Sequence, residues 1–179
     1  MRLFFAVELP HDVQAELGRL RRGEDADYRW SDPSLLHVTL AFLGEQPEEH
    51  LDVLQRVGAA AAQASPRGTL RLGEAGSFGT KRAPRVLWVG LDGDLPKLTA
   101  LQSNLARGLR EAGFALEDRP FSPHVTLARR RVRATGEAPA GWPPHLAHPH
   151  FEMDHLTLFQ SRLSPRGPTY IPLFTFPLH

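Results

Sequence analysis

The sequence predicts an α+β protein with antiparallel sheets, and three observations support this fold class. Helix-like patterns alternate with short strand-like runs, and glycine- and proline-rich turns separate many of these runs. The tetrapeptide His-Val-Thr-Leu occurs twice, at residues 37–40 and 124–127. Each half of the chain holds a helix, one such strand and a later pair of strands, which is a loose internal repeat. We therefore expect antiparallel sheets that carry helices on one face.

The chain is expected to form one domain made of two similar halves. Its 179 residues, 41% of them hydrophobic, suffice for a domain of ordinary size with a real core. The break between the halves falls near Gly93 to Pro96. The expected organisation is therefore a single domain, 1–179, with halves of approximately 1–92 and 93–179.

The first half is expected to contain a strand, a helix, a second strand, a helix and a pair of strands. Apolar residues recur at helical spacing in both helices, and the second helix begins with Pro47 and two acids. A turn is expected around residues 30–33. In order, the elements are the strand 2–8, the helix 11–22, the strand around His37, the helix 47–64, and the strands 69–75 and 85–91, which flank the glycine-rich loop GSFGTKRAP.

The second half shares a helix, a His-Val-Thr-Leu strand and a later pair of strands with the first half. A helix pattern runs from Pro96 to Ala112 and ends at Gly113. The second His-Val-Thr-Leu strand follows, and a basic run comes directly after it. A proline-rich loop is expected over 138–149. The closing strands are 155–161 and 170–176, joined by the turn SPRGP.

Composition and charge exclude several classes of function. The chain has no cysteine, so disulfides and thiolate metal sites are impossible, and a reducing cytoplasm is the expected compartment. No segment is long and apolar enough to span a membrane. The formal net charge is +1, so no strong field draws the protein to nucleic acid or lipid. Apart from Lys81 and Lys97, the basic residues are arginines, whose planar fork can grip a phosphate with two hydrogen bonds.

The repeated tetrapeptide places histidine and threonine on one face of a strand. Side chains alternate along a strand, so His37 and Thr39 point the same way, about 6.6 Å apart along the backbone. His124 and Thr126 repeat the arrangement. If a pseudo-two-fold axis relates the halves, two imidazoles and two hydroxyls converge on one site.

Such a set suits general acid–base chemistry on a phosphate. The unperturbed pKa of histidine is about 6.5, so one imidazole can be neutral while its neighbour is protonated. The threonine hydroxyls can hold phosphate oxygens, and no metal is needed to activate water. A single histidine in a strand is more often a structural residue. The catalytic interpretation of His37 and His124 depends on their corresponding positions in two similar halves.

Five segments give the chain a resemblance to a known family. It is similar to the two-histidine phosphoesterase superfamily, whose signature is a pair of His-x-Thr-x motifs. Within that superfamily it most resembles the RNA 2′,3′-cyclic phosphodiesterases, also named 2′-5′ RNA ligases. The segments are RLFFAVELP, RWSDPSLLHVTLAFLG, GSFGTKRAPRVLWVGL, FSPHVTLARR and LTLFQSRLSPRGPTY.

The resemblance implies both a fold and an activity. The fold would be bilobal, with two pseudo-two-fold-related lobes around an open central cleft and one motif in each lobe. Each lobe would be an antiparallel sheet with helices on its outer face, and the lobes could exchange terminal strands. The activity would be metal-independent hydrolysis of RNA 2′,3′-cyclic phosphate ends to 2′-phosphates. The resemblance also suggests His37 as the general acid and His124 as the general base. The residues alone do not show which histidine has which role.

The resemblance also assigns a phosphate-binding role to Arg129, five residues after His124. Strand alternation argues against this in its simplest form, because Arg129 would point away from the face of His124 and Thr126. It reaches the cleft only if the strand ends or bulges near Ala128. The alternative is a solvated cluster of arginines at the strand end.

The glycine-rich segment 73–82 lacks the ending of a nucleotide-binding P-loop. A flexible hairpin connection is the simplest interpretation. The resemblance places it near the cleft, where Phe78 could stack on a base and Lys81 or Arg82 could meet the RNA backbone.

Four histidines between 145 and 155 have metal-like spacing, but their proline-rich surroundings favour a solvated loop. We therefore expect no metal and no cofactor. The expected partner is an RNA end with a 2′,3′-cyclic phosphate, bound by a monomer that needs no protein partner.

Three other functions stay open at this point. Neither lysine lies in the Lys-x-Asp-Gly context of an ATP-dependent ligase, so ligation would have to be the reverse reaction, without ATP. A non-catalytic module that binds RNA ends would need aromatic and basic residues but not two imidazoles. A cyclic phosphodiesterase of small nucleotides would use the same site as an RNA enzyme.

Overall fold

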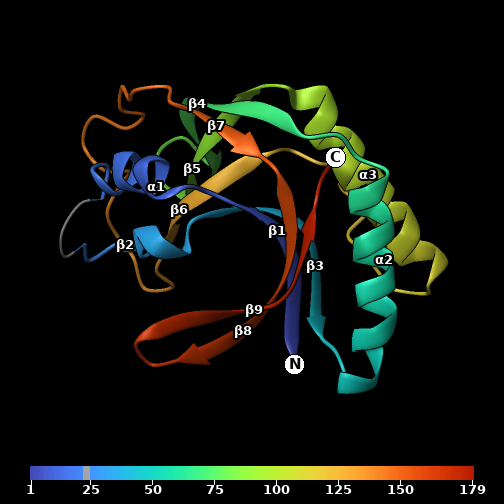
Figure 1. Ribbon diagram of the computed structural model, residues 1–179. Helices are drawn as coiled ribbons and strands as arrows, with labels where there is room; N and C mark the ends of the chain where they lie inside the picture. Colours follow the sequence, from blue (N-terminus) through green and yellow to red (C-terminus); the bar gives the residue numbers. More distant parts are fainter. Residues whose placement is uncertain (22–24) are drawn as a thin grey trace.

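The computed structural model describes residues 1–21 and 25–179, and it confirms the α+β class with antiparallel strands (Figure 1). Two short 3-10 turns, Pro33–Leu35 and Glu48–His50, precede β3 and α2. The helices are α1 His11–Gly18, α2 Leu51–Gln63 and α3 Leu95–Glu111. The strands are β1 Arg2–Glu8, β2 Tyr28–Trp30, β3 His37–Glu45, β4 Gly68–Gly79, β5 Pro84–Gly93, β6 His124–Arg130, β7 His150–Met153, β8 His155–Ser164 and β9 Gly167–Pro177.

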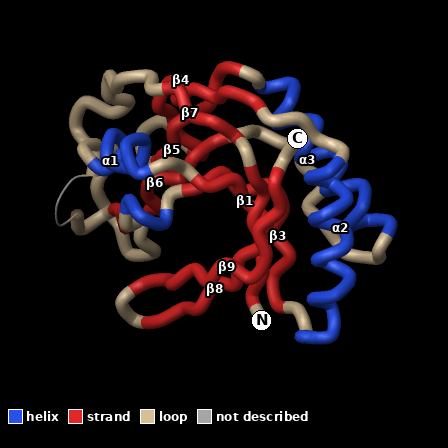
Figure 2. The backbone as a smooth tube through the Cα atoms, in the orientation of Figure 1, coloured by secondary structure: helices blue, strands red, loops and turns tan. Residues whose placement is uncertain are grey.

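The strands form one curled sheet in which every pairing is antiparallel (Figure 2). The order is β7-β4-β5-β6-β3-β1-β8-β9, and β2 pairs with β6 off this path. The central junction is the pairing of β3 with β6, the two strands that begin with histidine. Each side of this junction takes strands from both halves of the sequence, because β1 and β3 lie with β8 and β9. We call β3-β1-β8-β9 the β3 arm and β6-β5-β4-β7 the β6 arm.

The helices cover the sheet unequally. α2 contacts β8 and β9, and α3 contacts β3, so both lie mainly against the β3 arm, although α3 also contacts β4 (Figure 1). The core between them contains the fully buried Phe5, Leu105 and Leu158. Gly58 lets α2 approach the sheet closely, because a Cβ there would lie 2.6 Å from the ring of Phe176. α1 lies on the other side and contacts the 3-10 turn before β3.

The predicted helix 11–22 is shorter in the structure. It ends at Gly18, and the chain turns through residues 19 and 20. Gly18 lies against Pro33, whose ring carbon would be 2.9 Å from an added Cβ. Residue 22, the last of the predicted helix, lies outside the described residues.

The prediction of a loop for GSFGTKRAP was wrong over its first four residues and at its last residue, Pro84, which begins β5. β4 continues through Gly76 and Phe78 to Gly79, so only residues 80–83 connect it to β5. Gly76 is needed because the Trp88 indole lies over it, 2.5 Å from the position of an added Cβ. Glycine is therefore required at position 76 because β4 lies close to the Trp88 side chain of β5. The strands β2 and β7, which are only three and four residues long, were not predicted from the sequence.

Candidate functional site

The first histidine of the site is anchored at the start of β3. Asp32 caps the preceding 3-10 turn by accepting a hydrogen bond from the Ser34 N–H. The chain then becomes extended, and His37 Nδ1 lies 2.7 Å from the carbonyl oxygen of Leu35. A carbonyl only accepts, so Nδ1 carries the proton and Nε2 is the atom that gains or loses one. Nε2 lies 2.9 Å from the Thr39 hydroxyl.

The second histidine is anchored in the same way. His124 Nδ1 lies 2.7 Å from the carbonyl oxygen of Ser122, again two residues upstream. The proton on Nδ1 therefore leaves His124 Nε2 available for proton transfer as well. Both imidazoles have the tautomer that acid–base chemistry at Nε2 requires.

The β3–β6 junction brings the two motifs together. Val38 pairs with Val125 in antiparallel register. One residue to either side of this pair, His37 lies beside Thr126, and Thr39 lies beside His124. All four polar side chains line one cavity of about 240 Å³. The predicted convergence of two imidazoles and two hydroxyls is therefore present in the structure.

A bulge follows each motif, and the two bulges correspond. Along β3 the register with β1 slips between Thr39 and Ala41, so Leu40 has no partner. Along β6 the register with β5 slips between Thr126 and Ala128, so Leu127 has no partner on β5. The unpaired leucine and the following alanine are both buried in each strand. The bulge shifts the alternation by one residue in both strands.

The shifted alternation decides the position of Arg129. Phe42 and Arg129, three residues after the respective threonines, are both exposed and line the cavity. The condition stated for Arg129, a bulge before Ala128, is therefore met. In the β3 arm the equivalent position holds Phe42, an aromatic ring in place of a guanidinium.

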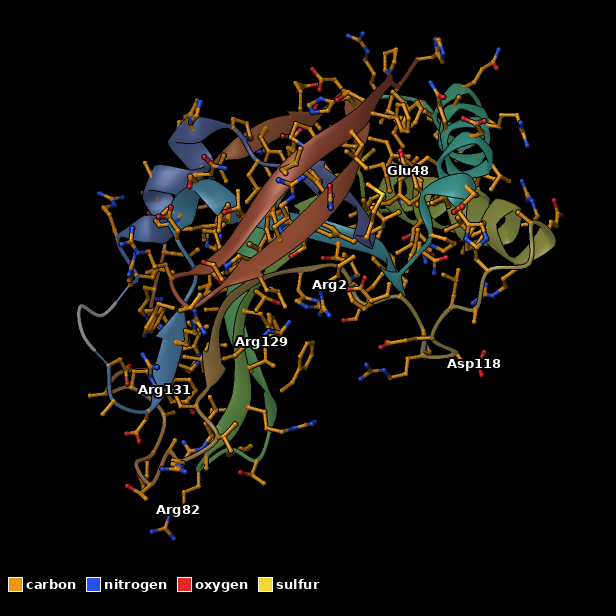
Figure 3. All side chains as sticks on the ribbon, turned by 90° about the horizontal axis from the view of Figure 1, so that it is seen from below. Arg2, Glu48, Arg82, Asp118, Arg129 and Arg131 are labelled. Carbon is orange, nitrogen blue, oxygen red and sulfur yellow. The ribbon has the colours of Figure 1, made fainter. Side chains whose placement is uncertain are left out.

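The cavity has a cationic lining. Arg2 and Arg129, both labelled in Figure 3, contribute to it, and the described residues of its lining include no carboxylate. Among the described residues, neither guanidinium has a hydrogen bond or an ion pair. The Arg2 guanidinium lies over the Phe42 ring, 4.8 Å from its centroid. Two such guanidiniums with two imidazoles make this cavity a site for an anion.

Aromatic rings flank both histidines. Phe4 and Tyr170 lie 5.0 and 5.3 Å from His37, measured between ring centroids. Phe78 contacts His124 at 5.1 Å, and Trp88 lies at 6.4 Å. These rings restrict the rotation of the imidazoles and reduce their exposure to water.

His37 and Tyr170 have shifted pKa values. Burial lowers the pKa of His37, and the charges of Arg129 and His124 lower it further, against the raising effects of the Leu35 carbonyl and Glu8. The lowered pKa favours the neutral form of His37 at neutral pH. Burial raises the pKa of the Tyr170 hydroxyl, although the charges of Arg129 and Arg2 act in the opposite direction.

The structure does not bring all of the predicted binding residues into the cavity. Phe78 contacts His124 and Trp88 but is not part of the cavity lining. Lys81 and Arg82 lie in the turn between β4 and β5, where Arg82 pairs with Glu137 at 2.9 Å. Figure 3 shows Arg82 well away from Arg129.

The lining residues that sequence reasoning missed include Arg2, Phe4, Phe42 and Tyr170. The first two had a usable signal, because Arg2 and Phe4 alternate in β1 and so share a face. The pentapeptide His-Val-Thr-Leu-Ala, present in both motifs, aligns Phe42 with Arg129. Tyr170 gave no local signal.

The histidines between 145 and 155 separate in the structure. His155 is the first residue of β8, and its Nε2 contacts Glu8 at 2.7 Å and its Nδ1 contacts Asp154 at 2.6 Å. His148 Nδ1 lies 2.9 Å from the Leu72 carbonyl oxygen. Within residues 1–21 and 25–179, no cluster of three or more acidic or histidine side chains has a metal-binding arrangement.

An α+β fold with duplicated His-Val-Thr-Leu strands around a cationic cavity defines a class of phosphate-handling proteins. The chain belongs to the 2′-5′ RNA ligase superfamily, whose family model matches residues 9–164.

Its relatives and structural neighbours match over nearly the full chain. It is 34% identical to the RNA 2′,3′-cyclic phosphodiesterase of Thermus thermophilus, over 99% of this chain and 90% of that protein. The crystal structure of TT0787 from Thermus thermophilus superposes with a TM-score of 0.85, at 33% identity and 99% and 98% coverage. The structure of E. coli LigT complexed with 3′-AMP gives a TM-score of 0.78, at 28% identity and 99% and 97% coverage.

Proposed function

We propose that this protein hydrolyses 2′,3′-cyclic phosphate ends of RNA to 2′-phosphates, with His37 and His124 as general acid and base. The observation that carries the proposal is the pair of imidazoles with protonated Nδ1 and available Nε2, on two strands joined at Val38 and Val125. The full-length relatives named RNA 2′,3′-cyclic phosphodiesterase support the same reaction.

The cyclic phosphate would lie between the two motifs. Its non-bridging oxygens would accept hydrogen bonds from the Thr39 and Thr126 hydroxyls and from the Arg129 guanidinium, all of which line the cavity. Charge-assisted hydrogen bonds of this kind are roughly twice as strong as neutral ones. The arginine also offsets the negative charge on the non-bridging phosphate oxygens during attack.

The reaction needs one proton removed and one supplied. The base takes a proton from water as its oxygen attacks phosphorus, and the bond from phosphorus to O3′ breaks. The acid protonates O3′, which leaves a 3′-hydroxyl and a terminal 2′-phosphate. Each of the two roles is typically worth about 10²–10⁴ in rate.

The division of labour follows the family resemblance, with His37 as acid and His124 as base. The lowered pKa of His37 requires that the bound phosphate supplies part of the field that protonates it. A phosphate placed between Arg129 and His37 does this, because its negative charge opposes that of the guanidinium. We therefore expect His37 to bind its proton together with the substrate.

RNA is the proposed partner because a 2′,3′-cyclic phosphate requires a ribose 2′-oxygen, which DNA lacks. The cytoplasm is the proposed compartment. No helix within the described residues has the length and apolarity of a membrane span. ATP-dependent ligation is not favoured, since neither Lys81 nor Lys97 lines the cavity.

The test is turnover of an oligonucleotide that ends in a 2′,3′-cyclic phosphate, with the product identified as 2′- or 3′-phosphate. His37→Ala and His124→Ala should each lower kcat by about 10² or more. His145→Ala is the matched control, because His145 is exposed in the proline-rich loop. Near wild-type turnover by either site variant, or a 3′-phosphate product, would reject the proposal. Activity should also survive EDTA, and its loss with recovery on adding a divalent ion would reject the metal-independent mechanism.

A further inference from the structure

Arg2 is a second guanidinium in the cavity that the proposed reaction does not use. The attacked phosphate already has two hydroxyls, two imidazoles and Arg129. Arg2 lines the same cavity from β1, one strand farther from the junction than β3. Like Arg129, it has no ion pair or hydrogen bond within the described part of the chain. A buried or half-buried cation without a counterion points to an anionic ligand.

The two guanidiniums occupy different places relative to His37. The charge of Arg129 lowers the pKa of His37, and the charges of both arginines act on the pKa of Tyr170. Phe4 lies between Arg2 and the His37 ring, because it follows Arg2 on the same face of β1 and contacts His37 at 5.0 Å. Arg2 is therefore displaced from the reacting phosphate toward β8 and β9.

The pseudo-symmetry of the two arms supports this displacement. The position of Arg129 in the β6 arm is taken by Phe42 in the β3 arm, after an equivalent bulge. Phe42 supports the guanidinium of Arg2 at 4.8 Å. In the β3 arm the guanidinium therefore comes from β1 and not from β3, about one strand spacing (about 4.8 Å) farther from the β3–β6 junction. Each arm therefore presents one guanidinium to the cavity, Arg129 from β6 and Arg2 from β1.

The same side of the cavity offers an apolar surface for a nucleoside. Phe42 is 45% exposed and Leu163 is 68% exposed, and both line the cavity. Exposed apolar side chains at a cavity rim commonly contact a ligand. If the 2′,3′ side of a nucleoside on this surface lies at the histidines, its 5′ side can extend toward Arg2.

We propose that Arg2, supported by Phe42, binds the phosphate on the 5′ side of the terminal nucleotide. The protein would then recognise an RNA end by two phosphates and would prefer it to a cyclic nucleotide with a free 5′-hydroxyl. This inference rests on the proposed hydrolysis of 2′,3′-cyclic phosphates. It separates an enzyme of RNA ends from one of small nucleotides.

The experiment uses two substrates that differ in one group. They are adenosine 2′,3′-cyclic phosphate with a 5′-hydroxyl and the same molecule with a 5′-phosphate. The wild-type protein should show a kcat/KM at least about tenfold higher for the 5′-phosphorylated substrate, as a charge-assisted contact implies. Arg2→Gln should remove this preference, and Arg2→Lys should keep part of it.

Arg162→Gln is the matched control. Arg162 follows Ser161 in β8, is exposed, and does not line the cavity, although its neighbour does. Arg162→Gln also removes one positive charge from the β3 arm. This variant should still prefer the 5′-phosphorylated substrate. The ratio between substrates is an internal measure, so a partial loss of folded protein does not affect it.

The outcomes separate the two proposals. A wild-type protein that turns over both substrates equally, or an Arg2→Gln variant that keeps the preference, overturns the role of Arg2 and leaves the hydrolysis intact. Loss of the preference in Arg162→Gln also overturns it, since a general field would then be the cause. No turnover of either substrate, or of a cyclic-phosphate oligonucleotide, overturns the proposed function itself.

Discussion

Leu40 and Leu127 are equivalent residues, each unpaired in a bulge that follows a His-Val-Thr motif. Both side chains are buried, at 4% and 2% exposure, so each leucine packs in the core. Beyond each leucine, the alternation of side chains between the two faces of the strand is shifted by one residue. A straight strand would direct the third residue after each threonine away from the cavity. The bulges direct Phe42 and Arg129 into it. The duplicated motif therefore includes its bulge as well as its polar residues.

Arg129→Gln should raise the pKa of His37, because it removes a positive charge that lowers that pKa. The change is measured by NMR titration of the His37 imidazole in the substrate-free protein. Arg133→Gln is the control, since Arg133 is exposed and does not line the cavity. An unchanged or lower His37 pKa in Arg129→Gln would show that the guanidinium does not act on this histidine.

Thr39→Ala and Thr126→Ala should weaken the binding of a 2′-phosphate product by about 1.5–3 kcal/mol, which is the cost of one hydrogen bond to a charged group. Product inhibition constants measure this effect. The pH dependence should change less than the affinity, because the histidines keep their carbonyl anchors. Thr126→Ser keeps the hydroxyl and should bind nearly as the wild type does. Alanine variants with wild-type affinity would contradict the phosphate contacts.

Gly76→Ala should destabilise the fold by about 1–3 kcal/mol and lower activity, because a Cβ at 2.5 Å from the Trp88 ring forces that ring against Phe78 and His124. Thermal unfolding and kcat measure the two effects. Gly90→Ala is the control on β5, where the nearest atom to an added Cβ lies at 3.5 Å. Equal stability of the two variants would contradict the packing argument.

His155 should stabilise the protein at acidic rather than basic pH. Burial alone lowers its pKa, but the hydrogen bonds and charges of Asp154 and Glu8 outweigh burial and raise it above 6.5. The protonated form is therefore favoured in the folded state. Its contribution is fully present below about pH 6.5 and is lost as pH rises through the folded-state pKa.

His155→Gln measures this contribution. The variant should lose roughly 1 kcal/mol or less of unfolding free energy near about pH 5.5, since the ring is a third exposed, and less than that near about pH 9. Denaturant unfolding at the two pH values is the measurement, with His145→Gln as the control. A larger loss of unfolding free energy at the basic pH than at the acidic pH would contradict a raised pKa of His155 in the folded state.

A substrate with a good 3′ leaving group tests which histidine is the acid. Such a leaving group needs no proton, so His37→Ala should recover most of its activity on it, while His124→Ala should not. Comparison of kcat/KM on this substrate and on the ordinary cyclic phosphate gives the answer. If the activated substrate restores the activity of His124→Ala alone, His124 is the acid and His37 is the base. If both variants lose the same activity on this substrate, the assignment of acid and base is unsupported.

The fold class and the centre of the site could be predicted from the amino-acid sequence alone. Hydrophobic periodicity is local, so within the part of the chain that the structure describes it predicted the three helices and seven of the nine strands. Strand alternation placed His37 with Thr39 and His124 with Thr126. The repeated tetrapeptide showed that the two pairs correspond. These features were predictable because each depends on residues close together in the chain.

The surroundings of that centre depend on contacts between distant parts of the chain. The short strands β2 and β7 form because β6 and β4 offer them partners, and the bulges at Leu40 and Leu127 arise from pairing with other strands. Those long-range pairings turn Arg129 into the cavity and bring Arg2 and Tyr170 to it, from opposite ends of the chain. Register between distant strands is set by the packing of the whole sheet, so no local pattern of residues contains it.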